Sequence, residues 1–273
     1  NKFTKTWAVG AAWNLHQEAF MAELSKYVSM FKIRSSIGNP GNQNFDAYMT
    51  MNNYIYNLNF PNPFGLSAII RDWGNPHLQW QKTLDRNFGL DLEILNRKFY
   101  LNVDYFLKTT DPLLIYVQVP TSTGTNQIAQ NVGAQKTTGF TANFTYRAIV
   151  KENLLWNINF NARNLKSTYY DIGNSLNNLN VENTSRNLQR YYDGASTTDL
   201  WAVKSLGIDP ATGREVFLKK DGTQTFVHDF KDEQVLGNST PTWEGVAGTM
   251  LAYKGFSFSA NFRYRYGGQI FLN

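Results

Sequence analysis

The stretch GFSFSANFRYRYGGQIF, from Gly255 to Phe271, alternates regularly between two kinds of side chain. Between positions 256 and 266, every second residue is aromatic or alanine, and the residues between them are serine, asparagine or arginine. A β-strand presents successive side chains to opposite faces, so the pattern predicts a strand with one apolar and one polar face. Such a strand suits either a soluble sheet that covers a protein core or the wall of a membrane barrel.

The composition is compatible with many strands of this kind. Of the 273 residues, 42% are hydrophobic and 15% are aromatic, which is sufficient for a folded core. Charged residues make up 17% of the chain, below the roughly 25% that is typical of soluble domains. Cysteine is absent from the sequence, which excludes disulfides, cysteine-ligated metals and cysteine nucleophiles within it.

The charge and the hydropathy exclude further classes of protein. The formal net charge is +5 and the pI is near 9.2, but no basic run is longer than two residues, so nucleic-acid binding is not expected. Attraction to an anionic membrane surface or to acidic glycans suits this charge at least as well. No run of 18 apolar residues occurs and the mean hydropathy is −0.41, so a transmembrane helix is not expected.

The alternating pattern recurs along the chain and predicts about eight strands. They are expected at 6–13, 30–38, 83–95, 99–109, 139–149, 154–164, 242–252 and 256–266. Segment 14–29, between the first two strands, is expected to form a helical turn or two.

The connections between these strands alternate between short and long. Short ones are expected at 96–98, 150–153 and 253–255, and long ones at 39–82, 110–138 and 165–241. Loops beyond about 15 residues are uncommon in compact soluble domains, whereas outer-membrane barrels combine short periplasmic turns with long extracellular loops. The loop lengths therefore favour a barrel wall over the alternative, a soluble β-sandwich whose aromatic residues form the core.

Several blocks of sequence carry a more specific signal. They are FKIRSSIGNPGNQNF (31–45), NPHLQWQKTLDRNFGLDLEILNRKFYLNVDYFLKTTDPLL (75–114), TGFTANFTYR (138–147), GIDPATGREVFLKKDG (207–222) and YKGFSFSANFRYRYGGQIF (253–271). In this order they resemble the C-terminal barrel half of the SusC/RagA family of TonB-dependent outer-membrane transporters. Gln81 departs from the pattern, because the family usually has an acidic residue there.

The resemblance implies an all-β fold, an antiparallel transmembrane β-barrel of 22 strands that is plugged by an N-terminal domain. It implies active import of oligosaccharides or peptides across the outer membrane of a Gram-negative bacterium of the Bacteroidetes. A SusD-like surface lipoprotein would close the barrel, TonB would supply energy, and transporter–lipoprotein pairs would form a dimer. Residues 1–273 would then be part of the barrel domain, without the plug, the first strands and the last strands, so we expect the chain to be a fragment.

The sequence offers no arrangement of residues that indicates an enzyme. His16, His77 and His228 lie far apart and lack metal-ligand spacing, so neither a metal nor another cofactor is expected. Asp91 and Glu93 share one strand face and could in principle form an acid–base pair. We interpret them instead as charges that face a watery lumen beside arginine and lysine from neighbouring strands.

Aromatic residues in the long connections are candidates for contact with a substrate or with the lipoprotein. Aromatic faces cover the C–H surfaces of sugars, while the neighbouring amides and carboxylates can bind the hydroxyl groups. The candidates are Tyr54, Tyr56, Trp73, Trp80, Tyr169, Tyr170, Tyr191, Tyr192 and Trp201. The alternative is that these rings pack the loops against each other.

The polar faces of the strands supply a second group of candidates, which are expected to face the lumen. They are Arg147, Arg163, Asn261, Arg263 and Arg265. The arginines could steer an anionic substrate, or they could pair with the aspartates Asp85, Asp91 and Asp104 and brace the wall. On the other face of the last strand, the side chains expected to face lipid are Phe256, Phe258, Phe262, Tyr264 and Tyr266.

Two other functions compete with import. A soluble β-rich carbohydrate-binding module would use the same loop aromatics to bind glycans. A passive porin or an adhesin barrel would have the same wall but no dependence on TonB.

Overall fold

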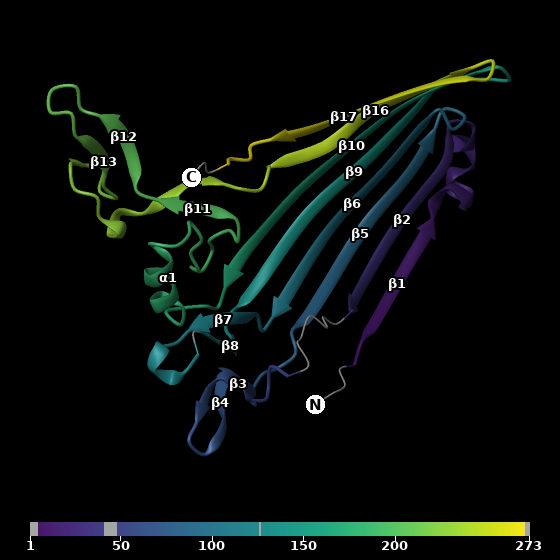
Figure 1. The fold of residues 1–273 in the computed structure, drawn as a ribbon. Helices are drawn as coiled ribbons and strands as arrows, with labels where there is room; N and C mark the ends of the chain where they lie inside the picture. Colours follow the sequence, from purple (N-terminus) through teal and green to yellow (C-terminus); the bar gives the residue numbers. More distant parts are fainter. Residues whose placement is uncertain (1–4, 41–47, 126, 271–273) are drawn as a thin grey trace.

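The computed structural model describes residues 5–40, 48–125 and 127–270. Its largest element is an eight-stranded antiparallel sheet with the order β1-β2-β5-β6-β9-β10-β16-β17 (Figure 1). The strands are β1 (Trp7–Asn14), β2 (Val28–Asn39), β5 (Lys82–Ile94), β6 (Phe99–Asp111), β9 (Ala134–Lys151), β10 (Leu154–Tyr170), β16 (Trp243–Tyr253) and β17 (Phe256–Tyr266). Each strand expected from the alternating pattern is a strand of this sheet.

Two of these strands extend by five or more residues beyond their expected range at one end. β9 begins at Ala134 and not at 139, and β10 continues to Tyr170 and not only to 164. The backbone pairing is continuous through this region, from Leu165 opposite Gly139 to Tyr170 opposite Ala134. In these extensions both faces of the strands carry mostly polar side chains. The alternating pattern is therefore lost, although the strands continue.

Short turns lie at one end of the sheet, at the upper right of Figure 1. The turn between β16 and β17 consists of Lys254 and Gly255, which have φ angles of 45° and 88°. Two consecutive positive φ angles are typical of the tight turns that join twisted antiparallel strands. At the same end, β1 and β2 are joined by two 3-10 helices, η1 (Leu15–Gln17) and η2 (Ala19–Lys26), where helical turns were expected.

The long connections lie at the opposite end, toward the lower left of Figure 1, and contain elements that the sequence did not predict. The helical elements are η3 (Thr121–Thr123), α1 (Asn177–Asn183) and η4 (Phe230–Asp232). The strands are β3 (Asn53–Asn62), β4 (Gly65–Asp72), β7 (Leu114–Gln118), β8 (Gln127–Asn131), β11 (Asp199–Ala202), β12 (Lys204–Ile208), β13 (Glu215–Leu218), β14 (Gln224–Thr225) and β15 (Gln234–Asn238). They form small sheets, β3-β4, β7-β8, β11-β15 and β12-β13-β14.

One face of the large sheet is apolar in register from strand to strand. One row across it consists of Leu92, Leu101, Phe144, Phe160, Ala247 and Phe262. Several large side chains on this face are exposed, including Val9 at 66% and Phe262 at 71% of their surface, while others such as Leu101 and Phe144 are half-buried between their neighbours. A soluble β-sandwich would bury this face against a second sheet, which is not the arrangement of the described residues.

Tyr264 lies flat on this apolar face. Its ring stacks against Phe160, with the ring centroids 5.6 Å apart and an angle of 7° between the planes. Its hydroxyl donates a hydrogen bond to the backbone oxygen of Asn161 at 2.9 Å. Gly245 is opposite Tyr264 on β16, the strand that separates β10 from β17. A Cβ added at Gly245 would be 2.6 Å from the tyrosine oxygen.

The buried core lies in the long connections and not under the sheet. It consists of Leu113, Tyr169, Ile172, Leu176 and Leu179, with Ile115, Val117, Val132 and Tyr191 packed around it. This cluster joins the ends of β6 and β10 to the segment around α1, so it fixes the connections on the edge of the sheet.

Within the ranges that the structure describes, no helix is both long and apolar enough to span a membrane. Parts of two sequence blocks, residues 41–45 and Phe271, lie outside the described residues.

Candidate functional site

The polar face of the sheet contains a cross-strand network centred on Arg34 in β2. The Nε atom of Arg34 lies 2.9 Å from Oδ2 of Asp91, and its Nη2 donates a hydrogen bond to Oδ1 of Asp104 at 2.9 Å. Gly89 lies directly between Arg34 and Asp104 in register. A Cβ at Gly89 would be 2.6 Å from both contacting atoms, so the ion pair needs a glycine at this position.

An amide ladder continues the network toward β9. Asn143 Nδ2 donates to Asn102 Oδ1 at 3.0 Å, and Asn102 Nδ2 donates to Asp91 Oδ1 at 2.7 Å. The connected side chains therefore span β2, β5, β6 and β9. A hollow of about 310 Å³ lies beside Arg34, lined by small residues that include Gly10 and Ser36.

The acidic pair on β5 has basic partners, as the sequence interpretation expected. Asp91 pairs with Arg34, and Glu93 lies 3.6 Å from Nη1 of Arg147. The same Nη1 donates a hydrogen bond to the backbone oxygen of Arg97 at 2.7 Å, which fixes Arg147 near the short β5–β6 turn.

The other candidate arginines lie on the polar faces of β10 and β17. Arg263 Nη2 and Arg265 Nε approach the same oxygen, Oε2 of Glu244, at 3.3 and 3.5 Å. Arg163 lies opposite Glu244 in register but makes no ion pair or hydrogen bond within the described part of the chain. Asn261 lies on the same face, opposite Gly248.

Of the two alternatives for these arginines, pairing with Asp85, Asp91 and Asp104 is not observed among the described residues. Asp85 pairs with Lys108 at 3.2 Å, and Asp91 and Asp104 pair with Arg34. The reason is the strand order, because β5 and β6 are separated from β16 and β17 by β9 and β10. The aspartates are therefore neutralised by basic residues from the adjacent strand or from the next strand but one.

Two of the candidate aromatic residues, Tyr54 and Trp73, line a cleft of about 500 Å³. The cleft lies between the β3–β4 hairpin and the β7–β8 hairpin, and Arg71, Asp72 and Tyr116 also line it. Trp73 Nε1 donates a hydrogen bond to the backbone oxygen of Thr123 at 2.7 Å, which links the two connections. The cleft thus combines ring faces with one cation and one carboxylate.

The remaining candidates in the first two connections are outside this cleft. Tyr56 lies farther along β3 and is 70% exposed. Trp80 is half-buried in the segment that leads into β5. The structure therefore separates each of the two sequence pairs, Tyr54/Tyr56 and Trp73/Trp80, into a cleft residue and a residue outside it.

The third connection places its aromatic residues in two pairs. The rings of Tyr169 and Tyr191 lie 5.3 Å apart in the buried core, and burial raises the pKa of Tyr191 above its ordinary value. The rings of Tyr192 and Trp201 lie 5.1 Å apart, and Tyr192 is 39% exposed. Tyr170, the last residue of β10, is half-buried. Tyr169 and Tyr191 serve packing here, whereas Tyr192 presents surface to solvent.

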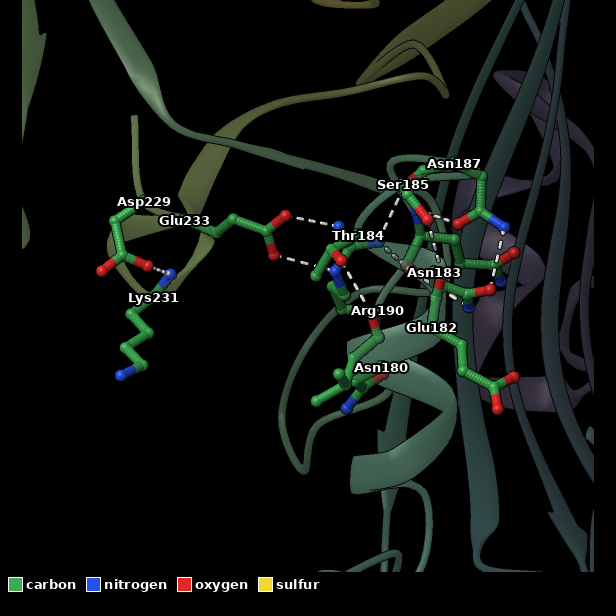
Figure 2. Close-up of polar contacts among 12 residues, drawn as sticks. Asn180, Glu182, Asn183, Thr184, Ser185, Asn187, Arg190, Asp229, Lys231 and Glu233 are labelled. Atoms are coloured by element: carbon green, nitrogen blue, oxygen red, sulfur yellow. Dashed lines mark hydrogen bonds and ion pairs between the residues drawn. The ribbon is translucent and has the colours of Figure 1, made fainter. Parts of the chain in front are cut away.

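Sequence reasoning missed a buried ion pair in the same connection (Figure 2). Arg190 is only 1% exposed, and its Nε donates a hydrogen bond to Oε2 of Glu233 at 2.8 Å. Its Nη1 donates to the backbone oxygens of Asn187 and Gln189, each at 2.8 Å. The pair ties the segment after α1 to the start of β15. No local pattern could reveal it, because the partners are 43 positions apart.

In the residues described by the structure, no group of three or more histidine, aspartate or glutamate side chains is placed to hold a metal ion. His228, for example, packs edge-on between the rings of Phe217 and Phe230, at centroid distances of 5.2 and 4.7 Å. The surfaces that the structure does bring together are a hydrogen-bonding polar wall and an aromatic cleft.

Comparisons with curated proteins find similarity to TonB-dependent receptors. No protein-family model matches it. It is 23% identical over 97% of its length to TonB-dependent receptor P39 of Formosa agariphila, and 26% identical over 99% to TonB-dependent receptor P26 of the same organism. It is 29% identical over 56% of its length to TonB-dependent receptor SusC of Bacteroides thetaiotaomicron. The chain spans 29% of the length of the two Formosa proteins and 16% of SusC.

Solved structures support the same fold. The structure of the RagAB peptide transporter matches with a TM-score of 0.81 and 22% identity, over 96% of this chain and 29% of that one. The RagAB peptide importer in its closed-closed state matches with a TM-score of 0.80 and 24% identity, over the same shares. These relatives are named as receptors and transporters, and none of them is named as an enzyme. The resemblance read from the sequence is confirmed: the chain is similar along nearly its whole length to TonB-dependent receptors, is similar over 56% of its length to SusC, and shares the fold of the RagAB peptide transporter structure.

Proposed function

We propose that residues 1–273 form part of the transmembrane barrel of an outer-membrane transporter, with the apolar face toward lipid and the polar face toward the lumen. One observation carries this proposal. The apolar face is continuous across the sheet and carries exposed large side chains, while the buried core lies in and beside the long connections. In a bilayer the exposed side chains would be covered by acyl chains, as on known outer-membrane barrels.

The edges of the sheet support a larger barrel. Within the described residues, β1 pairs only with β2 and β17 pairs only with β16. A strand edge in lipid leaves backbone groups without partners, which is costly enough that spanning sheets are closed. We therefore propose that further strands of the same protein continue the sheet on both sides, up to the 22 strands that the family resemblance implies.

The proposed activity is TonB-dependent import of oligosaccharides or peptides in a Gram-negative bacterium of the Bacteroidetes, with a SusD-like lipoprotein as the partner on the cell surface. A dimer of transporter–lipoprotein pairs is part of the proposal. The proposed import activity is supported by the similarity to SusC and to the RagAB peptide importer. The position of all long connections at one end of the sheet also supports it. That end would face outward, where a substrate and a lipoprotein can reach it.

The aromatic cleft is the proposed contact site for substrate or lipoprotein in these connections. Tyr54 and Trp73 line it, with Arg71 and Asp72 at the same cleft. Exposed Tyr56 and Tyr192 extend the set of rings that a ligand can reach.

The experiment follows the full-length protein during cell fractionation and gel electrophoresis. We expect it in the outer-membrane fraction, with a mobility that differs between boiled and unboiled samples. A soluble protein with the same mobility in both samples would favour a carbohydrate-binding module. Uptake that persists after deletion of TonB in the native host would favour a passive porin, and loss of uptake would favour the active importer.

A further inference from the structure

The charges on the polar face of the sheet are distributed unevenly. On the polar faces of β5 and β6, the four acidic residues all have basic partners: Lys108 for Asp85, Arg34 for Asp91 and Asp104, and Arg147 for Glu93. This half of the wall is therefore close to neutral, and its ion pairs hold neighbouring strands together.

The half formed by β10, β16 and β17 is different. Three arginines, Arg163, Arg263 and Arg265, are on its polar face with a single acidic residue, Glu244. Two of the arginines share one oxygen of that carboxylate, and Arg163 has no ion pair in the part of the chain that is described. One carboxylate cannot neutralise three guanidinium groups, so this part of the wall keeps excess positive charge.

The arginines are held on strands, and their spacing is fixed by the register. Arg163 and Arg265 lie on opposite sides of Glu244 in one row across the sheet, and Arg263 is on the same face, two residues before Arg265. Glu244 is the second residue of β16, next to the third long connection. The cluster therefore lies near the end of the wall at which the long connections gather (Figure 1).

The guanidinium groups are accessible for binding. The side chains of Arg263 and Arg265 are 63% and 58% exposed, whereas that of Glu244 is 29% exposed. A guanidinium group presents planar pairs of donors that match a carboxylate or a sulfate bidentately. Positive charge on a low-dielectric wall also attracts anions from a distance.

We propose that Arg163, Arg263 and Arg265 form a binding site for the anionic groups of the imported chain, so that the transporter prefers acidic oligomers over neutral ones. This inference rests on the proposed import function and adds the charge class of the substrate to it. The shared ligand chemistry is a carboxylate repeated along an oligomer, which can come from uronic-acid sugars or from acidic peptides.

The test uses the purified full-length transporter in lipid nanodiscs and two matched pairs of probes. One pair is hexaglutamate and hexaglutamine, and the other is hexagalacturonate and its methyl ester. We expect the wild type to bind at least one carboxylated probe more tightly than its neutral partner. The triple variant R163Q/R263Q/R265Q should bind that probe about tenfold more weakly, as expected for lost hydrogen bonds to a charged group. Its affinity for the neutral probes should not change.

A second triple variant controls for net charge. K98Q/K151Q/K254Q removes the same number of positive charges from residues in or beside the short turns, at the other end of the sheet. It should bind the carboxylated probe like the wild type, and R163K/R263K/R265K should retain most of the preference. The probe pair with the larger difference identifies the source of the carboxylate, sugar or peptide.

Two results would overturn the inference: equal binding of charged and neutral probes by the wild type, or equal losses in the two glutamine variants. A protein in the outer membrane that imports neutral chains equally well would contradict this inference alone. A protein absent from the membrane would contradict the proposed function instead.

Discussion

Gly89 shows how a single residue of the wall depends on its neighbours. A Cβ added at this position would lie 2.6 Å from the atoms of the ion pair between Arg34 and Asp104, so a side chain here would require the ends of both charged side chains to move. A polar face with large charged residues on adjacent strands needs such gaps, and glycine supplies one here. The same reasoning does not apply to every glycine of the sheet.

We predict that Gly89→Ala lowers the thermal stability of the full-length protein in detergent. The added methyl group forces Arg34 and Asp104 apart, and overpacking of this kind costs about 1–3 kcal/mol. Gly10→Ala, on the polar face of β1, is the matched control. A Cβ there would lie 3.5 Å from its nearest neighbours, an ordinary contact, so little change is expected. Equal melting temperatures for the two variants would contradict the role of Gly89.

The buried pair of Arg190 and Glu233 leads to a second prediction at this scale. Glu233→Gln leaves the guanidinium charge buried without its partner, at a cost of about 3–5 kcal/mol to the packing of this connection. We expect faster hydrogen exchange around α1 and β15 in this variant. The double variant Arg190→Met, Glu233→Leu removes both charges and should recover much of the protection. Normal protection in the single variant would show that the pair does not hold the connection.

At the scale of the element, β17 carries the two faces in their clearest form. Phe262 is on the exposed apolar face, and Asn261 and Arg263 are on the polar face. We predict that Phe262→Lys strongly reduces the assembled, heat-modifiable form of the full-length protein, because a lysine toward lipid costs about 2–4 kcal/mol near the bilayer midplane.

Asn261→Lys is the control for this prediction, because it places the same charge one residue away, on the face proposed to be wet. Assembly close to that of the wild type is expected. If both lysine variants assembled equally well, or equally poorly, the two faces of β17 would not differ in their surroundings.

The strands of the large sheet could be predicted from sequence because each has one apolar face. The prediction failed where that contrast is lost, as in the polar extensions of β9 and β10 beyond 139 and 164. The short strands of the connections, such as β14 (Gln224–Thr225), are too brief to show any period. The pairing of Tyr169 with Tyr191 and of Arg190 with Glu233 depends on how the connection folds back on itself, which spacing along the chain does not contain.

Among the candidate site residues, the sequence indicated the arginines of the polar face but left open whether they pair with aspartates, and the partners it offered as one alternative are not those observed. The pairing of Arg34 with Asp91 and Asp104 follows from the strand order, which places β2 next to β5, with β6 on the far side of β5. The sequence indicated only some residues of the cleft. Tyr54 and Trp73 were candidates, but Tyr116, which comes from the other hairpin, was not. Aromatic residues in a loop are visible in a sequence, but the surface they share is not.

At the scale of the whole molecule, the distribution of exposed and buried apolar residues is the reverse of that in a soluble β protein, where the sheets bury their apolar faces and the loops are exposed. Many apolar side chains of the sheet are exposed, and the main cluster of buried apolar residues lies in and beside the connections at one end. This arrangement is stable only if another apolar phase covers the outer face of the sheet. Lipid outside and water inside the wall satisfy both faces at once.

The most direct test of this account is the accessibility of successive residues along β17 in the full-length protein in lipid vesicles. Cysteine is absent from residues 1–273, so a spin label can be placed on single cysteines at Phe258, Ser259, Phe262 and Arg263. The account predicts that labels at Phe258 and Phe262 collide mainly with oxygen dissolved in the bilayer. Labels at Ser259 and Arg263 should collide mainly with a water-soluble nickel complex. Uniform accessibility to the nickel complex at all four positions would contradict the central claim that this sheet is a membrane wall.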